Sequence, residues 1–328
     1  MSTLVNVRSA RVASFACALI VVAACTDASG GVQFDPGTVA AGPREGSPST
    51  TQGLGGETGS GSIAAFERPR AMDHIRALAG RIGVRVRATD GERRGARYIK
   101  RRFEDLGYRV FVQKYSVDGG TSRNVVARWP GARRYPIVLG AHMDSVPSSP
   151  GANDNASGVA VLLEVARLVR DTEQAGFLKF IAFGSEEFGS DGRHHVGSQV
   201  FVNRLGDKGR RKMGGMISVD MVADGRPLII GTSGIGPDVL ARILYRKLNR
   251  AGFSVTYRTL CDCSDNGPFE RAGIPASFMW SGDEPNYHDS SDTVENMSPA
   301  DLERTGKAVR LFIVRAVDQA LLDRLRRY

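Results

Sequence analysis

Apolar and polar positions predict helices and strands that alternate through most of the chain. Residues 69–80 and 156–170 carry apolar side chains at helical spacing, and Asp90 begins another helix that Gly107 ends. Short apolar runs bounded by turn residues predict strands between the helices. Further helices are expected at residues 237–251 and 301–324, and strands at residues 108–115, 124–129, 137–142, 178–184, 216–220 and 274–280.

This alternation predicts an α/β fold. Strands that alternate with helices favour a mostly parallel sheet with helices on both faces. We therefore expect residues 63–328 to form a single-domain three-layer sandwich around a mostly parallel, mixed β-sheet. A chain of this length can build one core, and no internal repeat marks a second domain.

The N-terminus follows a different pattern. Arg8 and Arg11 precede the stretch ASFACALIVVAA, which is too short to span a bilayer and is typical of a signal-peptide core. The stretch ends in VAAC at residues 22–25, which resembles the lipobox of bacterial lipoproteins, where the cysteine is lipidated. We expect residues 1–24 to be a lipoprotein signal peptide, and the protein to be exported to the cell envelope, periplasm or cell surface. An ordinary signal peptide is the alternative.

Residues 25–62 predict a flexible tether. They are rich in Gly, Ser, Thr and Pro and nearly free of large apolar groups, so they cannot bury enough surface to fold. Such a tether would hold the folded domain off the membrane to which lipidated Cys25 anchors it. A removable propeptide is the second interpretation.

Charge and cysteine content refine the picture. The formal net charge is +9, but the arginines are spread over predicted helices without interleaved aromatics, so nucleic-acid binding has little support. A solvated helix face near anionic lipid explains the charge better.

In the folded part only Cys261 and Cys263 remain, and their spacing is not that of a zinc finger. They form either a disulfide or a pair of free thiols.

Polar residues at the ends of apolar runs predict a metal centre. Parallel strands bring such residues to one edge of the sheet, where ligands bind. A catalytic zinc takes three ligands of the His, Asp or Glu kind, and two zinc ions ~3.5–4 Å apart can share one ligand and one water. With Asp154 shared, His142 and Asp220 complete one site, and Glu187 and His288 complete the other.

Two further acidic residues have predicted roles beside the two zinc ions. Glu186 adjoins a ligand without being needed as one, so we expect it to accept a proton from the bridging water and pass it to a leaving group. Asp144 lies two residues from His142, close enough to orient the imidazole. The catalytic residues expected from this arrangement are therefore Glu186 and Asp144.

The ordered motifs of residues 80–295 resemble those of the bacterial co-catalytic di-zinc aminopeptidases, which are related to glutamate carboxypeptidases and glutaminyl cyclases. The resemblance implies a zinc exopeptidase fold, the same ligand roles, and donation by Tyr287 to the developing oxyanion. The matching motifs are HMD, GANDNASG, EE followed by VGSQVFV, DM at residues 220–221, SDNGPFERAGIPA, and YH at residues 287–288.

The chain departs from this family pattern at two places. Asn266 replaces the usual His after SerAsp, and SDGRHH is inserted before VGS. Both changes lie beside the site and concern substrate preference more than reaction type. In the insertion, His194 and His195 are expected to be exposed, and contact of one of them with substrate is the alternative. His74 lies away from every motif, and Trp129 and Trp280 are expected in the core or in a pocket wall.

These observations predict a secreted zinc metalloprotease, a monomeric aminopeptidase that uses a metal-bridged hydroxide to hydrolyse peptides with a free N-terminus. A glutaminyl cyclase-like acyltransferase is the alternative from another class, although Tyr287 stands where such relatives tend to have Trp. Carboxypeptidase or dipeptidase specificity uses the same metal core and also stays open. A catalytically dead binding domain is disfavoured by the intact ligand set and by Glu186.

Overall fold

A computed structural model of the protein describes residues 65–225, 227–282 and 285–328. The predicted signal peptide, lipobox and tether lie outside the described residues. The helices are α1 (Arg68–Ile75), α2 (Asp90–Asp105), α3 (Gly158–Val169), α4 (Val196–Lys212), α5 (Val239–Arg250), α6 (Asn266–Arg271), α7 (Pro299–Ala316) and α8 (Gln319–Leu325). The strands are β1 (Arg109–Val117), β2 (Gly120–Arg128), β3 (Ile137–His142), β4 (Leu178–Phe183), β5 (Gly215–Val219), β6 (Leu228–Thr232), β7 (Val255–Thr259) and β8 (Ala276–Trp280).

The strands form one mixed sheet in the order β1-β2-β4-β3-β5-β8-β6-β7. The central strands β4, β3, β5 and β8 run parallel to one another, and β6 pairs parallel with β7. The pairs β1–β2, β2–β4 and β6–β8 are antiparallel. The predicted mostly parallel, mixed sheet is therefore confirmed.

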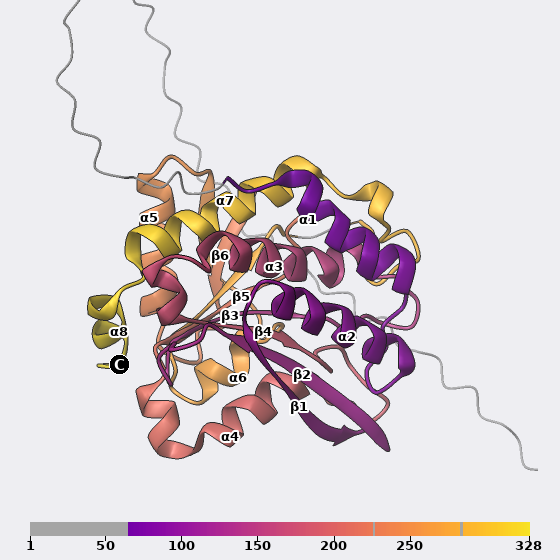
Figure 1. Cartoon of the computed structure of the whole chain (residues 1–328), viewed down its shortest axis with the longest axis horizontal. Helices are drawn as coiled ribbons and strands as arrows, with labels where there is room; N and C mark the ends of the chain where they lie inside the picture. Colours follow the sequence, from indigo (N-terminus) through magenta and orange to yellow (C-terminus); the bar gives the residue numbers. More distant parts are fainter. Residues whose placement is uncertain (1–64, 226, 283–284) are drawn as a thin grey trace, which may run out of the picture. The chain divides into compact units, whose positions relative to one another are not determined.

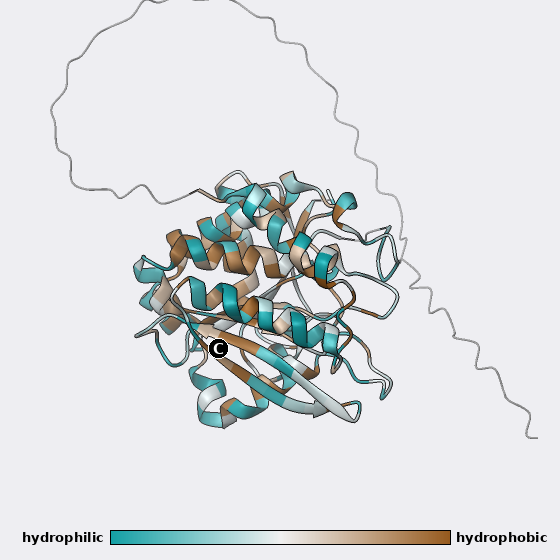
Figure 2. Ribbon diagram, turned by 45° about the vertical axis from the view of Figure 1, so that its right-hand side comes forward, coloured by the Kyte–Doolittle hydropathy of each residue, from teal (hydrophilic) through white to brown (hydrophobic). Residues whose placement is uncertain are grey.

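Helices cover both faces of the sheet. Figure 1 shows α1, α2, α3 and α7 above the sheet and α4 and α6 below it. The upper layer closes the larger apolar core, and the lower layer closes a smaller one that includes Val138, Phe183 and Phe201. Figure 2 shows that hydrophobic residues gather in the sheet and on the inner sides of the helices, while the outer sides are hydrophilic. This three-layer arrangement buries one stripe of each helix.

Local sequence signals explain where several elements begin. The Ser298 side chain accepts a hydrogen bond from the Asp301 backbone N–H, and Pro299 follows it, so α7 starts with a cap and a preset φ. In β3 every residue is buried, as a central strand requires. Gly140 is needed there because a Cβ at this position would lie 2.6 Å from the Phe183 ring.

Some elements were missed or misjudged from the sequence. Strands β6 and β7 and helices α4 and α6 were not predicted, and the single helix expected at residues 301–324 is two helices separated by Val317 and Asp318. Asp318 caps the second of them by accepting from the Leu321 backbone N–H. In the described part of the chain, each helix is too short or too polar to cross a bilayer.

Candidate metal centre

Three adjacent parallel strands deliver the first residues of the site. His142 is the last residue of β3, Glu186 and Glu187 follow β4, and Asp220 follows β5 directly. Because β4, β3 and β5 are neighbours and parallel, their carboxyl ends meet at one edge of the sheet. This places the four side chains together, although they are separated by up to 78 positions in the sequence.

His142 lies at the centre of the acidic side chains. Its ring is 1% exposed, and Nε2 lies 3.0 Å from Asp154 Oδ1, 3.2 Å from Asp220 Oδ1 and 3.8 Å from Glu186 Oε2. One imidazole nitrogen cannot satisfy three carboxylates at once. At least two of these buried carboxylates therefore need another partner at this point.

Asp154 connects His142 to a second group. Its Oδ1 faces His142, and its Oδ2 lies 3.3 Å from Nε2 of His288, which is also 3.2 Å from Glu187 Oε2. Burial alone would raise the pKa of Asp154, but the hydrogen bonds from the two histidines outweigh it and hold the pKa below its usual value. The peptide bond between Asp154 and Asn155 is cis.

The arrangement fits a pair of zinc ions. His142, Asp154 and Asp220 offer ligand atoms within 4.8 Å of one another, and so do Asp154, Glu187 and His288. The two sets share only Asp154. The buried Glu187 Oε1 has no hydrogen-bond partner among the described residues. Three ligands per ion of the nitrogen and oxygen kind are the donor set of a catalytic zinc, so the residues fit the metal.

Electrostatics point in the same direction. Burial, together with the charge of Asp154, raises the pKa of Glu187 to about 7, and burial raises the pKa of Glu186 well above its usual value. So many carboxylates at one buried point repel one another unless cations lie between them. The centre is thus arranged to receive positive charge.

His195 corrects an expectation from the sequence. It was expected to be exposed, but its ring is 1% exposed and its Nε2 lies 2.9 Å from Glu186 Oε1. Burial lowers the pKa of His195 to about 2, which keeps the ring neutral, and its Nε2 faces both the glutamate and, at 3.2 Å, Nδ1 of His194. Its neighbour His194 is partly exposed and stacks on Phe188. His195 therefore belongs to the site through Glu186.

The insertion SDGRHH is held in place by an arginine far away in the sequence. The Arg87 guanidinium pairs with Asp118 and Asp191 and donates to the backbone oxygens of Glu187 and Arg193. This anchor folds the inserted loop back on the site, which is why His195 points inward. Spacing along the chain carried no signal for the contact.

Asp144 lies beside the His142 ring, where the sequence analysis expected it, and it also supports the neighbouring turn. Its carboxylate oxygen is 3.7 Å from His142 Nδ1, whereas its backbone oxygen is 3.2 Å from that nitrogen. The carboxylate also accepts hydrogen bonds from the backbone N–H groups of Glu186 and Glu187, at 3.2 and 3.1 Å. Asp144 thus fixes the turn that carries both glutamates, and its carbonyl orients the imidazole.

A buried arginine and a buried aspartate support the Asp154 loop, and the sequence analysis missed both. Arg85 is fully buried and donates to the backbone oxygens of Met143, Pro150 and Gly151, among others. The Asp292 carboxylate accepts the backbone N–H groups of residues 153 and 154. These two charged groups set the position of the shared ligand, and neither lies in a motif that marks metal chemistry.

The SDN loop packs beneath Asp220. Ser264 Oγ donates to Asp220 Oδ2 at 2.8 Å, and Asp265 is fully buried beside it. Burial raises the pKa of Asp265 to about 7. Asn266 points away from the metal ligands and donates to Glu270 at 2.9 Å. Of the two states that the sequence left open for Cys261 and Cys263, the structure has the disulfide.

Backbone conformations at the site are unusual. Ser185, His195, Met221 and His288 all have φ between 49° and 58°, the left-handed region that favours glycine. Each is a residue of the site or a direct neighbour of one. Such conformations cost of the order of 1–3 kcal/mol each and cluster where surrounding structure enforces a functional geometry.

Tyr287 lies at the mouth of the site. Its side chain is 54% exposed, and its ring stacks on His288 with 3.7 Å between the ring centroids.

Away from the site, His74 forms a hydrogen bond with Tyr98, and Trp129 and Trp280 are half-buried against neighbouring aromatic rings. The positions of His74 and Trp129 agree with the expectation, since Trp129 packs against the larger core, whereas Trp280 belongs to neither core cluster of the described residues.

Comparison with known proteins identifies the family. Peptidase family M28 matches residues 124–313. Aminopeptidase YwaD of Bacillus subtilis is 33% identical over 60% of this chain and 45% of its own length. The probable lipoprotein aminopeptidase LpqL of Mycobacterium tuberculosis is 29% identical over 57% of this chain and 44% of its own length. The chain thus spans less than half of these two curated relatives.

The fold also agrees with a solved structure. BSAP, a zinc aminopeptidase from Bacillus subtilis, superposes with a TM-score of 0.71 at 20% identity, covering 78% of this chain and 96% of that one. The similarity establishes the common fold. The family match at residues 124–313 covers most of the described sheet and the site, and it shows that this chain belongs to peptidase family M28.

Proposed function

We propose that the protein is a zinc-dependent exopeptidase, specifically an aminopeptidase. The single observation that carries the proposal is the pair of three-residue ligand sets that share Asp154, with Glu186 beside them and free of both. Membership of family M28 and the names of the curated relatives support a peptidase with this specificity. Zinc bound at this centre would polarise a substrate carbonyl and lower the pKa of a water molecule.

The proton transfers fall to Glu186. Its carboxylate lies within reach of the space between the ligand sets, where His142 Nε2 is 3.8 Å away. Glu186 takes the proton of the attacking water and returns it to the departing amine. The hydrogen bond from His195 fixes one carboxylate oxygen and leaves the other to face the substrate.

Tyr287 and two carboxylates complete the proposed recognition. The Tyr287 hydroxyl donates to the carbonyl oxygen as negative charge develops on it. Glu186 and Asp220 hold the free α-amine of the substrate, because both are buried acidic groups at the same edge of the sheet. A blocked amine carries no positive charge for these carboxylates to hold.

A glutaminyl cyclase is the runner-up, because it shares this fold and a zinc centre in the resembled family. Tyr287 stands where such relatives tend to have Trp. The complete second set of Asp154, Glu187 and His288 also favours a two-metal hydrolase. Both observations place the aminopeptidase first.

A substrate panel tests the aminopeptidase specificity. A leucyl-type substrate should be hydrolysed, and its N-acetyl form should not, because a site built to pair with an amine rejects an analogue that lacks the charge. The panel also includes peptides with a blocked carboxyl end and an N-terminal glutaminyl peptide. Equal turnover of free and acetylated substrates would contradict the proposal. Release of ammonia from the glutaminyl peptide, with the pyroglutamyl residue still attached to the peptide, would favour the cyclase.

We further propose that the protein is an exported lipoprotein anchored through Cys25. The support is the VAAC sequence after a short apolar stretch, together with a relative described as a probable lipoprotein. Mass spectrometry of the mature N-terminus should find an acylated Cys25, and the protein should partition with membranes. An unmodified N-terminus beyond residue 25 in membrane-free culture fluid would contradict the anchor.

A further inference from the structure

A second cavity lies on the α4 face of the sheet, away from the metal centre. It has a volume of about 470 Å³, within the range of small-molecule sites. We call it the basic pocket and define it by its ten lining residues, none of which is acidic. They are Arg109, Val110, Phe111, Gln113, Val126, Arg128, Arg133, Arg134, Lys179 and Phe201.

Three of its cations form a row across the sheet. In the strand register Arg109 pairs with Arg128, and Arg128 pairs with Lys179. Residues directly opposite one another on antiparallel strands point to the same face, and like charges there destabilise the sheet. We call these residues the cation row. Its geometry stores repulsion that a bound anion would remove.

The cation row has no acidic partner of its own. Among the described residues, no salt bridge or side-chain hydrogen bond joins Arg109, Arg128 or Lys179 to a carboxylate. Elsewhere the surface arginines and lysines commonly pair with Asp or Glu one helical turn away, as Lys100 does with Glu104. Other surface cations such as Lys114 and Lys247 also have no carboxylate partner among the described residues. The row differs from them because its three unpaired cations lie directly opposite one another in the strand register.

Lys179 is the most buried member of the row. It is half-buried, and its ammonium lies 5.5 Å from the centroid of the Phe201 ring. Burial, with the charges of Arg128 and Arg134, lowers the pKa of Lys179 to about 8. A lysine with this environment gains most from a negatively charged partner.

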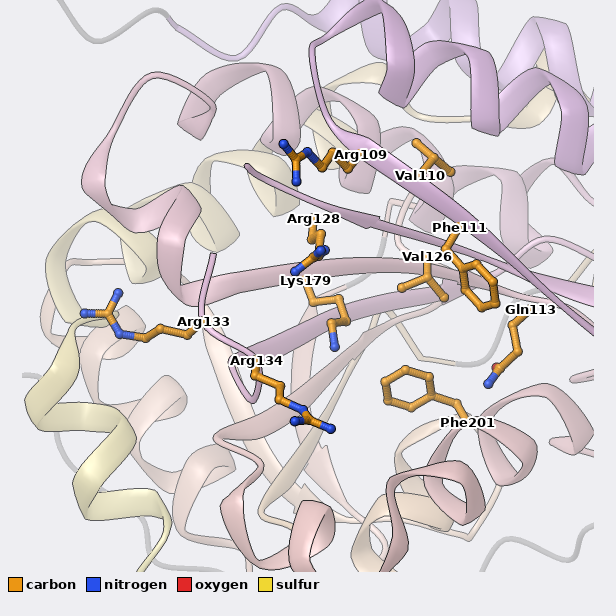
Figure 3. Close-up of a pocket in the computed structure, with 10 residues that line it drawn as sticks. All are labelled: Arg109, Val110, Phe111, Gln113, Val126, Arg128, Arg133, Arg134, Lys179 and Phe201. Atoms are coloured by element: carbon orange, nitrogen blue, oxygen red, sulfur yellow. The ribbon is translucent and has the colours of Figure 1, made fainter. Parts of the chain in front are cut away.

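The remaining walls define the shape of an occupant. Figure 3 shows Lys179 and Arg134 directing their charged ends into the space beside Phe201, while Arg133 extends away from it. Arg133 is already engaged with Gln319 and with the Phe177 ring. On the other side lies Phe111, whose side chain is 61% exposed. The pocket therefore offers a cationic end and an apolar end.

We propose that the basic pocket binds a phosphate ester, with the phosphate at the cation row and the apolar part of the ligand against the aromatic rings. Lys179 and Arg134, whose charged ends point into the same space, suit a group with two negative charges and several acceptor oxygens, as a phosphate has. A single carboxylate would leave most of the charge of the row unpaired. The ester is either a soluble metabolite-sized molecule or a phospholipid headgroup.

The basic pocket is separate from the peptidase site. Lys179 is the second residue of β4, and the glutamates of the metal centre follow the last residue of the same strand. The four residue steps from Lys179 to Phe183 alone span about 13 Å. Changes at the cation row should therefore leave the basal peptidase activity intact.

Titration of the zinc-loaded protein with phenyl phosphate tests the proposal. Calorimetry should detect binding to the wild type and to Lys114→Met, which makes the same charge change on β1 outside the pocket lining. Lys179→Met and Arg128→Gln should each weaken binding by at least about tenfold. Binding of phenyl phosphate at the metal centre would be unchanged in these variants. Any binding that they lose therefore belongs to the basic pocket. Peptidase activity shows that the variants fold.

A vesicle assay separates the two sources of the ester. Binding to phosphatidylglycerol vesicles in excess of phosphatidylcholine vesicles, lost in Lys179→Met, would support the pocket and assign it to lipid. Lys179-dependent binding of phenyl phosphate alone would assign it to a soluble ester. If neither probe binds the wild type, or both bind Lys179→Met and Arg128→Gln as tightly as the wild type, the proposal is wrong.

Discussion

Glu186→Gln should lower kcat by ~10²–10⁴ while both metals stay bound, because this is the usual contribution of a positioned general base. Gln keeps the size of the side chain and can still bond His195, so the fold should be preserved. Steady-state kinetics and metal analysis of the same sample measure the two effects. Glu187→Gln is the matched control, since Glu187 lies 3.2 Å from His288 and should lose metal as well as activity.

Replacing His195 tests whether its contact with Glu186 supports the same proton transfer. His195→Gln retains a donor for Glu186 and should keep most of the activity, whereas His195→Leu should lose kcat with little change in KM. His74→Leu is the control, because His74 lies on α1 and hydrogen-bonds Tyr98, away from Glu186 and His195. If Glu186→Gln is as active as the wild type, the assignment of the base is wrong.

Asp154→Ala should abolish both metal sites at once. Each three-residue set depends on Asp154, so its loss leaves only His142 and Asp220 on one side and Glu187 and His288 on the other. Because a bound metal stabilises the folded state, the variant should also lose stabilisation, about 4 kcal/mol where zinc exceeds its Kd a thousandfold. Urea unfolding with and without zinc measures this difference.

Asp207→Ala provides the control for that experiment. Asp207 is an exposed residue of α4, and its nearest cation, Arg210, lies 3.9 Å away. Its replacement should leave zinc content, activity and unfolding unchanged within about 0.5 kcal/mol. A variant of Asp154 that still binds one zinc ion tightly would show that the ligand is not shared.

The sequence predicted the part of the site that depends on strand ends. His142, Glu187 and Asp220 follow strongly apolar runs, and such runs form central strands almost regardless of their surroundings. Parallel packing then fixes where the strands end relative to one another. Asp154 and His288 could be predicted as ligands because each lies in a recognisable motif, GANDNASG and YH.

The parts that could not be predicted depend on contacts between distant segments. His195 is buried because Arg87 anchors the inserted loop through Asp191, a contact that spans 104 positions and has no periodic signal. The strand β7 was missed because it lies at the edge of the sheet, where alternate residues face solvent and apolar patterning is weak. Arg85 looks like a surface residue in the sequence, and only the folded loop shows its buried backbone partners.

Zinc content of the dialysed wild-type protein tests the central claim most directly. Elemental analysis against an accurate protein concentration should give two zinc ions per chain, as two ligand sets that share Asp154 require. Activity should be lost on chelation and return only when both sites are refilled. One tightly bound zinc ion per chain with full activity would contradict the account.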